Sequence, residues 1–271
     1  IIVKLSGNQL PLPATLEEHR EYLHKIVRLK LFFLHHWLSE HPDEDFRHAI
    51  RCRVDIYRKT DANPLNWNPP ELFWNSEKWL CMEERAYGIY TANKNNRDNF
   101  EAEAFEVFRP SIDARCRRDY EDSSRLDGFQ CGSLRHDIGV GKNGENSFHI
   151  ANAVAPHSIF DDPAYLPRCF RELMDFVEKE YGATRIFVHP TWLNSCSRWL
   201  AIFPEEWLEH LTPELEDVAW HYGFWGQFIT GRGTFNEKHA AYLRRTCRFP
   251  FYPRGSWCTI AAMRRSIARW L

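Results

Sequence analysis

The sequence predicts an α+β protein, with a mainly helical first part followed by a mixed, mostly antiparallel sheet with flanking helices. Two observations carry this prediction. Apolar residues recur at helical spacing through most of residues 15–120, whereas after Leu126 short runs of strand composition alternate with helical stretches. The change near residue 122 predicts a helical domain over 1–122 and an α+β domain over 123–271. A chain of 271 residues is long enough for one large domain or two modest ones.

Start and stop signals place the helices of the first part. Thr15 is followed three residues later by Glu18, which is the capping-box pattern, and apolar positions at helical spacing continue to Pro42. Acidic residues directly after Pro42 open a second helix, because the helix dipole favours negative charge at its N-terminus. The predicted helical stretches are 15–41, 43 onward, 76–92 and about 99–120, the last interrupted at Pro110, with a Pro- and Asn-rich break over 61–70.

The second part alternates strands and helices. Asn143-Gly144 lies between two stretches of strand composition, and Asn-Gly in that position is a strong signal for a hairpin. The predicted elements are strands over Phe129–Ile138 and Ser147–Val154, a helix over Pro163–Tyr181, a strand over Arg185–His189, a helix from Asn194 or Ser195 to Phe203, a turn at Glu205, a long strand over Val218–Ile229, a helix from Asn236 to about Thr246, and a last helix from Ser256.

Composition excludes several classes of protein. The 15% aromatic content and the mixed pattern exclude disorder and coiled coil. No apolar run approaches the roughly 20 residues of a membrane span, and the apolar run at residues 1–5 is too short for a signal-peptide core. The 8 cysteines include no Cys-x-x-Cys pair, so a zinc ribbon or a thioredoxin-like motif has no support. We therefore expect a cytoplasmic protein with reduced thiols and no membrane partner.

The net charge of −2 conceals an uneven distribution. Residues 126–230 carry 7 basic and 15 acidic side chains, whereas residues 231–271 carry 9 basic and 1 acidic. Arginine binds phosphate bidentately, so this basic tail, with Arg244 and Arg245, is a candidate site for a phosphorylated ligand or an acidic carrier protein. The alternative is that the tail packs against the acidic segment and pairs with its charges. A pI near 6.7 without an RNA-binding motif disfavours nucleic acid as a partner.

Four histidines fall on predicted strands, namely His136, His149, His189 and His221. In a hairpin with a two- or four-residue loop, directly paired residues have numbers with an odd sum, so His136 and His149 are expected on one face of the sheet. A neutral imidazole there could act as a general base near neutral pH, or several could bind a metal. The alternative is four unrelated, half-buried histidines, each satisfied by a backbone carbonyl.

Two further segments carry candidate site residues. Cys196 follows the strand that contains His189, and a helix N-terminus there would favour its thiolate; alternatively, Asn194 caps the helix and Cys196 fills space. The aromatic run 220–228 interleaves polar side chains with rings, as in a largely apolar pocket with a few oriented donors. The candidate substrate-binding residues are Trp192, Asn194, Trp225, Gln227, Arg244 and Arg245.

The order of elements after Leu126 is similar to the second half of the GNAT-type N-acetyltransferase fold. The chain resembles bacterial two-domain acyltransferase-like proteins, which carry a His-Ile strand and a Ser-Trp-Leu-Leu strand end; the matching stretches here are His149-Ile150 and Thr191–Asn194. The family's pyrophosphate loop is absent, and the two aspartates in 155–163 would repel a pyrophosphate at the helix start. The resemblance implies acyl transfer, with a CoA-type donor held elsewhere.

These observations lead to one leading hypothesis and two alternatives. The leading hypothesis is a transferase that moves an acyl group from CoA or a carrier-protein thioester, with no permanently bound cofactor, to a small-molecule amine or hydroxyl. His149, His189 or His221 would take a proton from the nucleophile, Tyr222 would protonate the leaving thiolate, and arginines of the tail would hold donor phosphates. The alternatives are a histidine-ligated metalloenzyme that acts on a small metabolite, and a non-catalytic protein that binds a small ligand.

Overall fold

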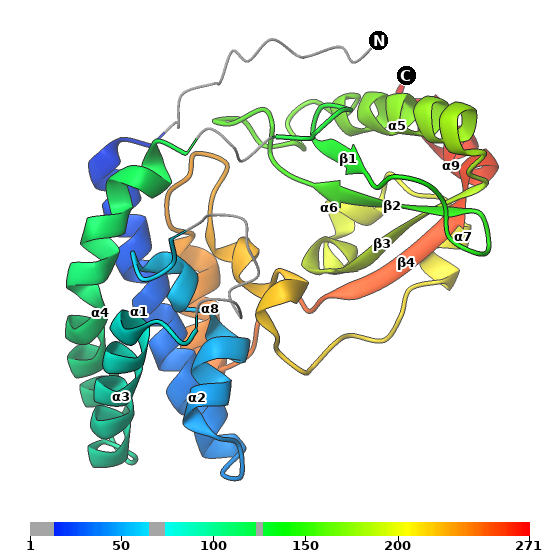
Figure 1. Ribbon diagram of the computed structural model, residues 1–271. Helices are drawn as coiled ribbons and strands as arrows, with labels where there is room; N and C mark the ends of the chain where they lie inside the picture. Colours follow the sequence, from blue (N-terminus) through cyan, green and yellow to red (C-terminus); the bar gives the residue numbers. More distant parts are fainter. Residues whose placement is uncertain (1–13, 65–73, 123–126) are drawn as a thin grey trace.

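A helical half and a sheet half lie next to each other in the computed structural model, which describes residues 14–64, 74–122 and 127–271 (Figure 1). The helical half contains α1 (Leu16–Glu40), α2 (Phe46–Ala49), α3 (Glu77–Ala92), α4 (Arg97–Tyr120) and α8 (Glu237–Thr246). The sheet half contains β1 (Leu134–His136), β2 (Glu145–Ile150), α5 (Tyr165–Tyr181), β3 (Arg185–Thr191), α6 (Ser197–Leu200), α7 (Glu205–Glu209), β4 (Arg254–Thr259) and α9 (Ile260–Ile267). The predicted combination of helices with a mixed sheet is therefore confirmed.

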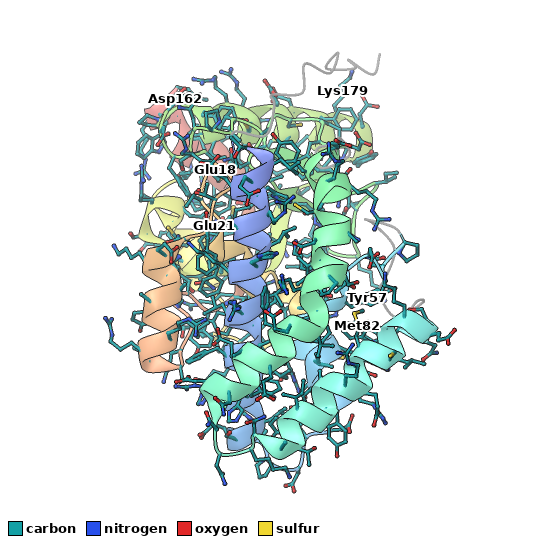
Figure 2. The ribbon with its side chains drawn as sticks, turned by 90° about the vertical axis from the view of Figure 1, so that its left-hand side faces the viewer. Glu18, Glu21, Tyr57, Met82, Asp162 and Lys179 are labelled. Carbon is teal, nitrogen blue, oxygen red and sulfur yellow. The ribbon has the colours of Figure 1, made fainter. Side chains whose placement is uncertain are left out.

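Helix starts follow the signals read from the sequence. The Thr15 hydroxyl accepts from the Glu18 N–H, and the Glu18 carboxylate accepts from the Thr15 N–H, so the capping box of α1 is present. Asn236 caps α8 as predicted. Pro110 lies inside α4 without ending it, and α4 runs alongside α1 (Figure 2). No helix within the described ranges is both long enough and apolar enough to cross a bilayer.

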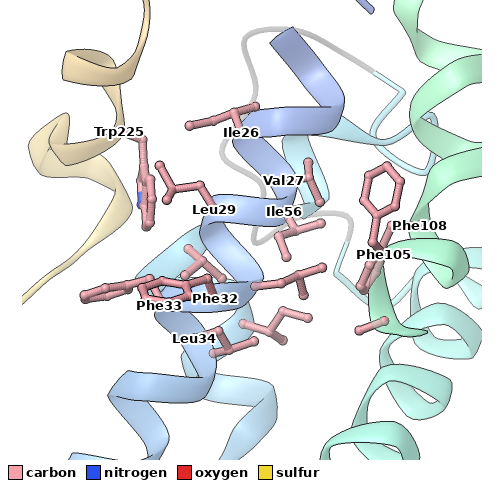
Figure 3. Packing of buried hydrophobic residues seen from close by; sticks show 14 of the residues in the cluster. Ile26, Val27, Leu29, Phe32, Phe33, Leu34, Ile56, Phe105, Phe108 and Trp225 are labelled. Carbon is pink, nitrogen blue, oxygen red and sulfur yellow. The ribbon is translucent and has the colours of Figure 1, made fainter. Parts of the chain in front are cut away.

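The core of the helical half includes side chains from far along the chain. Trp225, in the 3₁₀-helix η7 (Phe224–Phe228), packs edge-to-face on Phe33 of α1 with 5.7 Å between ring centroids (Figure 3). Phe249 packs on both rings. These aromatic contacts bury the segment that follows the sheet's third strand against the first helix of the chain.

Hydrophobic packing therefore divides the chain differently from the predicted domains 1–122 and 123–271. One buried cluster runs from Tyr22 to Cys116 and resumes from Val218 to Phe249, while the other is built from residues between Cys131 and Ile267 of the sheet half. The composition change near residue 122 coincides with the end of the first segment of the helical half. It does not predict that residues 218–249 also pack in that half. The predicted boundary itself, at residues 123–126, lies outside the described residues.

The four strands form one sheet in the order β1-β2-β3-β4. β1 and β2 are antiparallel, β2 and β3 are parallel and joined by α5, and β3 and β4 are antiparallel. One face packs into the buried cluster of the sheet half, which includes Phe148, Ile186 and Cys258 from the strands and Phe170 from α5. The sheet is thus mixed and mostly antiparallel, as predicted.

The predicted register of the first hairpin is wrong. His136 pairs with Phe148 and His149 pairs with Arg135, so directly paired residues have numbers with an even sum. His136 and His149 consequently lie on opposite faces of the sheet. The cause is the turn: the Gly141 N–H donates to the Glu145 carbonyl, so three residues, 142–144, lie between the paired residues, and an odd-numbered loop gives an even sum.

Two further predicted elements differ from the structure. Val218–Ile229 is not a strand, because Gly223 adopts a positive φ of 72° between the 3₁₀-helices η6 (Trp220–Tyr222) and η7. Ser256 does not open the last helix but lies in β4, where its hydroxyl donates to the Trp207 carbonyl; α9 begins after Thr259, which caps it. Apolar alternation in a short segment does not distinguish a buried strand from a helix packed on a core.

Candidate functional site

One face of the sheet is polar and partly exposed. Because side chains alternate along a strand, the pairing of Arg135 with His149 and of Ser147 with Phe187 places all four side chains on the same face. His189, two residues after Phe187 on β3, belongs to that face too. We call this surface the polar face. It lies opposite the face that packs into the buried cluster of the sheet half.

His149 has a carboxylate partner on the polar face. Its Nε2 lies 3.0 Å from Oδ1 of Asp137, the residue directly after β1, and the Asp137 N–H donates to the Ser147 carbonyl at 2.9 Å. Because a carboxylate accepts, Nε2 carries the proton and Nδ1 is the basic nitrogen, which has no partner among the described residues. The side chains of His149 and Asp137 are 40% and 46% exposed. An imidazole held in one tautomer and open to solvent suits a general base.

His189 lies at the carboxyl end of the neighbouring strand, on the same face as the Asp137–His149 pair, which we call the dyad. The last pair in the β2–β3 register is Ser147 with Phe187, and two residues further on His149 and His189 occupy corresponding positions. Both strands continue past that last pair, so they separate at their carboxyl ends. In Figure 1 these ends face the helical half. Ligands of open sheets bind at the carboxyl ends of parallel strands, so the fold favours a site here.

The helical half contributes His221 and Tyr222 to the same region. Both lie in η6, which packs against β3 and is fixed to the helical half by Arg58, whose guanidinium lies 4.3 Å above the Trp220 ring. The exposed His221 ring contacts that of Tyr222 at 4.1 Å between centroids. His136 does not join the group, since it points to the opposite face and stacks on Phe176 of α5. Among the described residues no hydrogen bond links any two of the four histidines.

Most of the predicted substrate-binding side chains form hydrogen bonds or ring contacts within the protein. Trp225 is buried and donates to the Arg53 carbonyl. Gln227 is buried; its amide donates to the carbonyls of Phe224 and Phe251 and accepts from the Phe251 N–H. The Trp192 ring stacks on that of Phe251 and remains half-buried. These contacts hold the segment 224–251 together, and of the three side chains only that of Trp192 keeps appreciable exposed surface.

Asn194 is buried and fully bonded as well. Its Oδ1 accepts from the indole N–H groups of Trp199 and Trp207, and its Nδ2 donates to the Arg254 carbonyl. It therefore ties α6 and α7 to β4. It does not cap the following helix, and Ser195, the other predicted cap, donates to the Tyr252 carbonyl.

We expect Asn194→Ala to lower the free energy of unfolding by about 3–5 kcal/mol, because it leaves two indole donors and one carbonyl buried without partners. Chemical denaturation checks this, with Asn95→Ala as the control: Asn95 is an exposed asparagine, whose loss changes stability by less than about 0.5 kcal/mol. An Asn194→Ala protein of normal stability that binds substrate poorly would contradict the structural role.

The two predicted phosphate-binding arginines have different surroundings. Arg244 forms a two-pronged ion pair with Glu101 of α4, at 2.7 and 2.8 Å, and so joins α8 to α4. Arg245 is exposed and lies near the Tyr242 ring. In the same tail, Arg264 pairs with Asp175 and Glu178 of α5, so part of the basic tail does pair with the acidic middle segment.

The other candidate chemistry has less support in the geometry. Within the described ranges, no group of three or more His, Cys, Asp or Glu side chains is arranged to hold a metal ion. Cys196 is half-buried and directly precedes α6, which has only four residues. A cavity of about 500 Å³ lies between α3 and α4, beside Cys81, Met82 and Arg85, and contains none of the predicted site residues.

No family model, curated protein or solved structure matches this chain. The assignment of a site rests on its geometry. Sequence reasoning missed two members of the polar face, Asp137 and Arg135. A signal was present: both residues flank His136 at the end of a predicted strand, so each is expected on the face opposite that histidine. The wrong hairpin register, which put His149 on the same face as His136, concealed their proximity to His149.

Proposed function

We propose that the protein transfers an acyl group from an anionic, thioester-type donor to a small-molecule amine or hydroxyl, with His149 as the general base. The hydrogen bond between Asp137 and His149 carries this proposal, because it gives one of the candidate histidines a fixed tautomer and a free basic nitrogen. It lies at the carboxyl end of the parallel strand pair, where the fold favours a ligand.

The chemistry follows from the dyad. As the acceptor's nitrogen or oxygen attacks the donor carbonyl, its proton passes to Nδ1 of His149, and the Asp137 carboxylate stabilises the imidazolium. The same proton then reaches the leaving thiolate, so His149 ends in its starting state. Tyr222 and His221, on the turn that packs against β3, are the candidates for assisting the leaving group.

Arg135 is the candidate for holding the donor's negative charge. It lies directly opposite His149 on β1, is half-buried, and forms no ion pair with any described residue. Arg244, which the sequence favoured for this role, already pairs with Glu101. Its guanidinium lies 5.7 Å from the centroid of the Phe129 ring. A guanidinium without an acidic partner suits a phosphate or carboxylate, which it binds bidentately.

Three finer expectations belong to the same proposal. The β1–β2 hairpin, α5 and β3 follow the first part of the element order on which the GNAT-type resemblance rests, whereas the long strand of that order, Val218–Ile229, is replaced by 3₁₀-helices. We retain the resemblance on the first part. We also retain a cytoplasmic location. The donor is CoA or an acidic carrier protein bearing a thioester.

Arg135→Ala is expected to raise KM for an acyl-CoA donor about 10- to 100-fold with a small change in kcat, because a charge-assisted hydrogen bond contributes about 1.5–3 kcal/mol. An uncharged activated ester should show no such change. Steady-state kinetics with both donors check this, and Arg245→Ala is the matched control. An equal loss with both donors would contradict anion binding by Arg135.

The proposed function is tested by incubating the purified protein with acyl-CoA and a mixture of amines and alcohols, and measuring thiol release. We expect multiple-turnover release that depends on the acceptor and is lost in His149→Gln. Tight binding of a donor or acceptor without any thiol release would reject the transferase and identify the protein as a non-catalytic binding protein.

A further inference from the structure

Ser147 completes a group of three side chains on the polar face. It lies on β2 directly opposite Asp137, as the backbone hydrogen bond between them shows, and two residues before His149. Because strand side chains alternate, Asp137, Ser147 and His149 share one face. An acid, a base and a hydroxyl are thus gathered on two neighbouring strands.

The Ser147 hydroxyl is unusual because it is buried without a hydrogen-bond partner. The residue is 6% exposed, and its Oγ has no donor or acceptor among the described residues. Buried hydroxyls are almost always bonded, and leaving one unpaired costs about 1–3 kcal/mol. Other buried polar atoms are also unpaired, but this hydroxyl lies on the same face as Asp137 and His149, and that position points to a role in function.

The geometry brings His149 toward this hydroxyl. Two residues along a strand are about 6.7 Å apart, a gap that a serine and an imidazole can span. The imidazole leans toward the Asp137–Ser147 pair, since its Nε2 bonds Asp137 rather than a group further along the strand. Its Nδ1 is the nitrogen left for the hydroxyl. No bond joins Ser147 Oγ to His149 in this structure, where the hydroxyl is buried. A covalent step therefore requires the Ser147 side chain to rotate toward Nδ1.

We propose that Ser147 is a nucleophile that carries the acyl group as a covalent intermediate. This inference rests on the proposed function, and it adds that transfer takes place in two steps and that the donor leaves before the acceptor is acylated.

In the first step, Ser147 Oγ attacks the thioester carbonyl, its proton passes to His149 Nδ1, the C–S bond breaks, and the thiolate leaves with that proton. In the second step, the acceptor attacks the acyl-serine ester, its proton passes to His149, the C–Oγ bond breaks, and the proton returns to Oγ. Each step conserves atoms and charge and needs no further reactant.

The test is acylation of the protein by acetyl-CoA without acceptor, quenched with acid and followed by intact mass and peptide mapping. We expect one acyl group on the peptide that contains Ser147, and a burst of thiol release equal to the enzyme concentration. Ser147→Ala should abolish the adduct and slow turnover at least about 100-fold. It should not lower stability, because it removes an unpaired hydroxyl. Ser195→Ala, whose hydroxyl bonds the Tyr252 carbonyl, is the control.

The outcomes separate this inference from the proposed function. Normal turnover by Ser147→Ala, with loss of turnover in His149→Gln, would leave the transferase standing as a direct-transfer enzyme and overturn the covalent step. An acyl group found on another residue would overturn it too. Absence of both adduct and turnover in the unmodified protein would overturn both proposals.

Discussion

Replacement of His149 by glutamine is expected to lower the rate of acyl transfer about 10²- to 10⁴-fold, the usual contribution of a general base. Glutamine retains a polar side chain that can face Asp137, so the sheet should stay folded and thermal unfolding should change little. The half-exposed position of His149 supports this expectation, because the substitution changes a side chain that is 40% exposed.

Two other histidines provide matched comparisons. His189→Gln and His221→Gln alter exposed imidazoles near the same strand ends, but neither has a carboxylate partner among the described residues. Initial rates of thiol release for the three variants therefore identify which of the three histidines is the general base. A loss greater in His189→Gln or His221→Gln than in His149→Gln would assign the base to that residue and contradict the role of the dyad.

The second large effect concerns stability, and its origin is a buried lysine. Lys30 of α1 is 2% exposed, donates to the Asp55 carbonyl at 3.0 Å and lies 5.3 Å from the Trp225 ring. Burial lowers the pKa of its ammonium to about 7. The Asp55 carboxylate partly opposes this shift, whereas the positive charges of Lys59 and Arg58 add to it. The folded protein thus binds a proton on Lys30 more weakly than the unfolded chain does.

The pH dependence follows from this difference. Between pH 7 and pH 10.5 the unfolded chain retains the proton that the folded protein has released, so stability rises with pH across that window. Below pH 7 Lys30 is protonated in both states, and the full cost of burying its charge lowers the free energy of unfolding. At about 1.4 kcal/mol for each pH unit, the full change is about 5 kcal/mol.

Lys30→Met is expected to remove this dependence, because methionine fills a similar volume without charge. Denaturation of both proteins from pH 6.5 to pH 10 measures it, and the difference between them cancels the titration of every other group. The variant should be the more stable protein at pH 7, with the gap closing as the pH rises. A difference that stays constant with pH would show that Lys30 titrates normally.

The local elements of the fold could be predicted from the sequence. The capping box at Thr15, the cap at Asn236 and the amphipathic pattern of α5 each depend on a few neighbouring residues, and each is confirmed. The long-range packing could not be predicted in the same way. The return of Trp225 to α1 depends on contacts between residues about 190 positions apart, which no local pattern encodes.

For the candidate site, too, the sequence predicted local features but not long-range contacts. The region around β3 and η6 was identified from its histidines and tryptophans, and the structure does bring η6 against β3. Asn194 and Gln227 proved to be held by intramolecular bonds, because a buried polar group must find a partner and does so within the fold. The exposed Arg244 is held by its ion pair with Glu101. The partner of His149 was hidden by a register that depends on the length of one loop.

A double-mutant cycle between Asp137 and His149 tests the central claim most directly. Thiol release is measured for the unmodified protein, Asp137→Asn, His149→Gln and the double variant. If Asp137 acts by positioning His149, Asp137→Asn should slow the unmodified protein about 10- to 100-fold and have no further effect once His149 is replaced. If Asp137→Asn slows both backgrounds by the same factor, the two residues act independently, and the hydrogen bond between them is not the basis of catalysis.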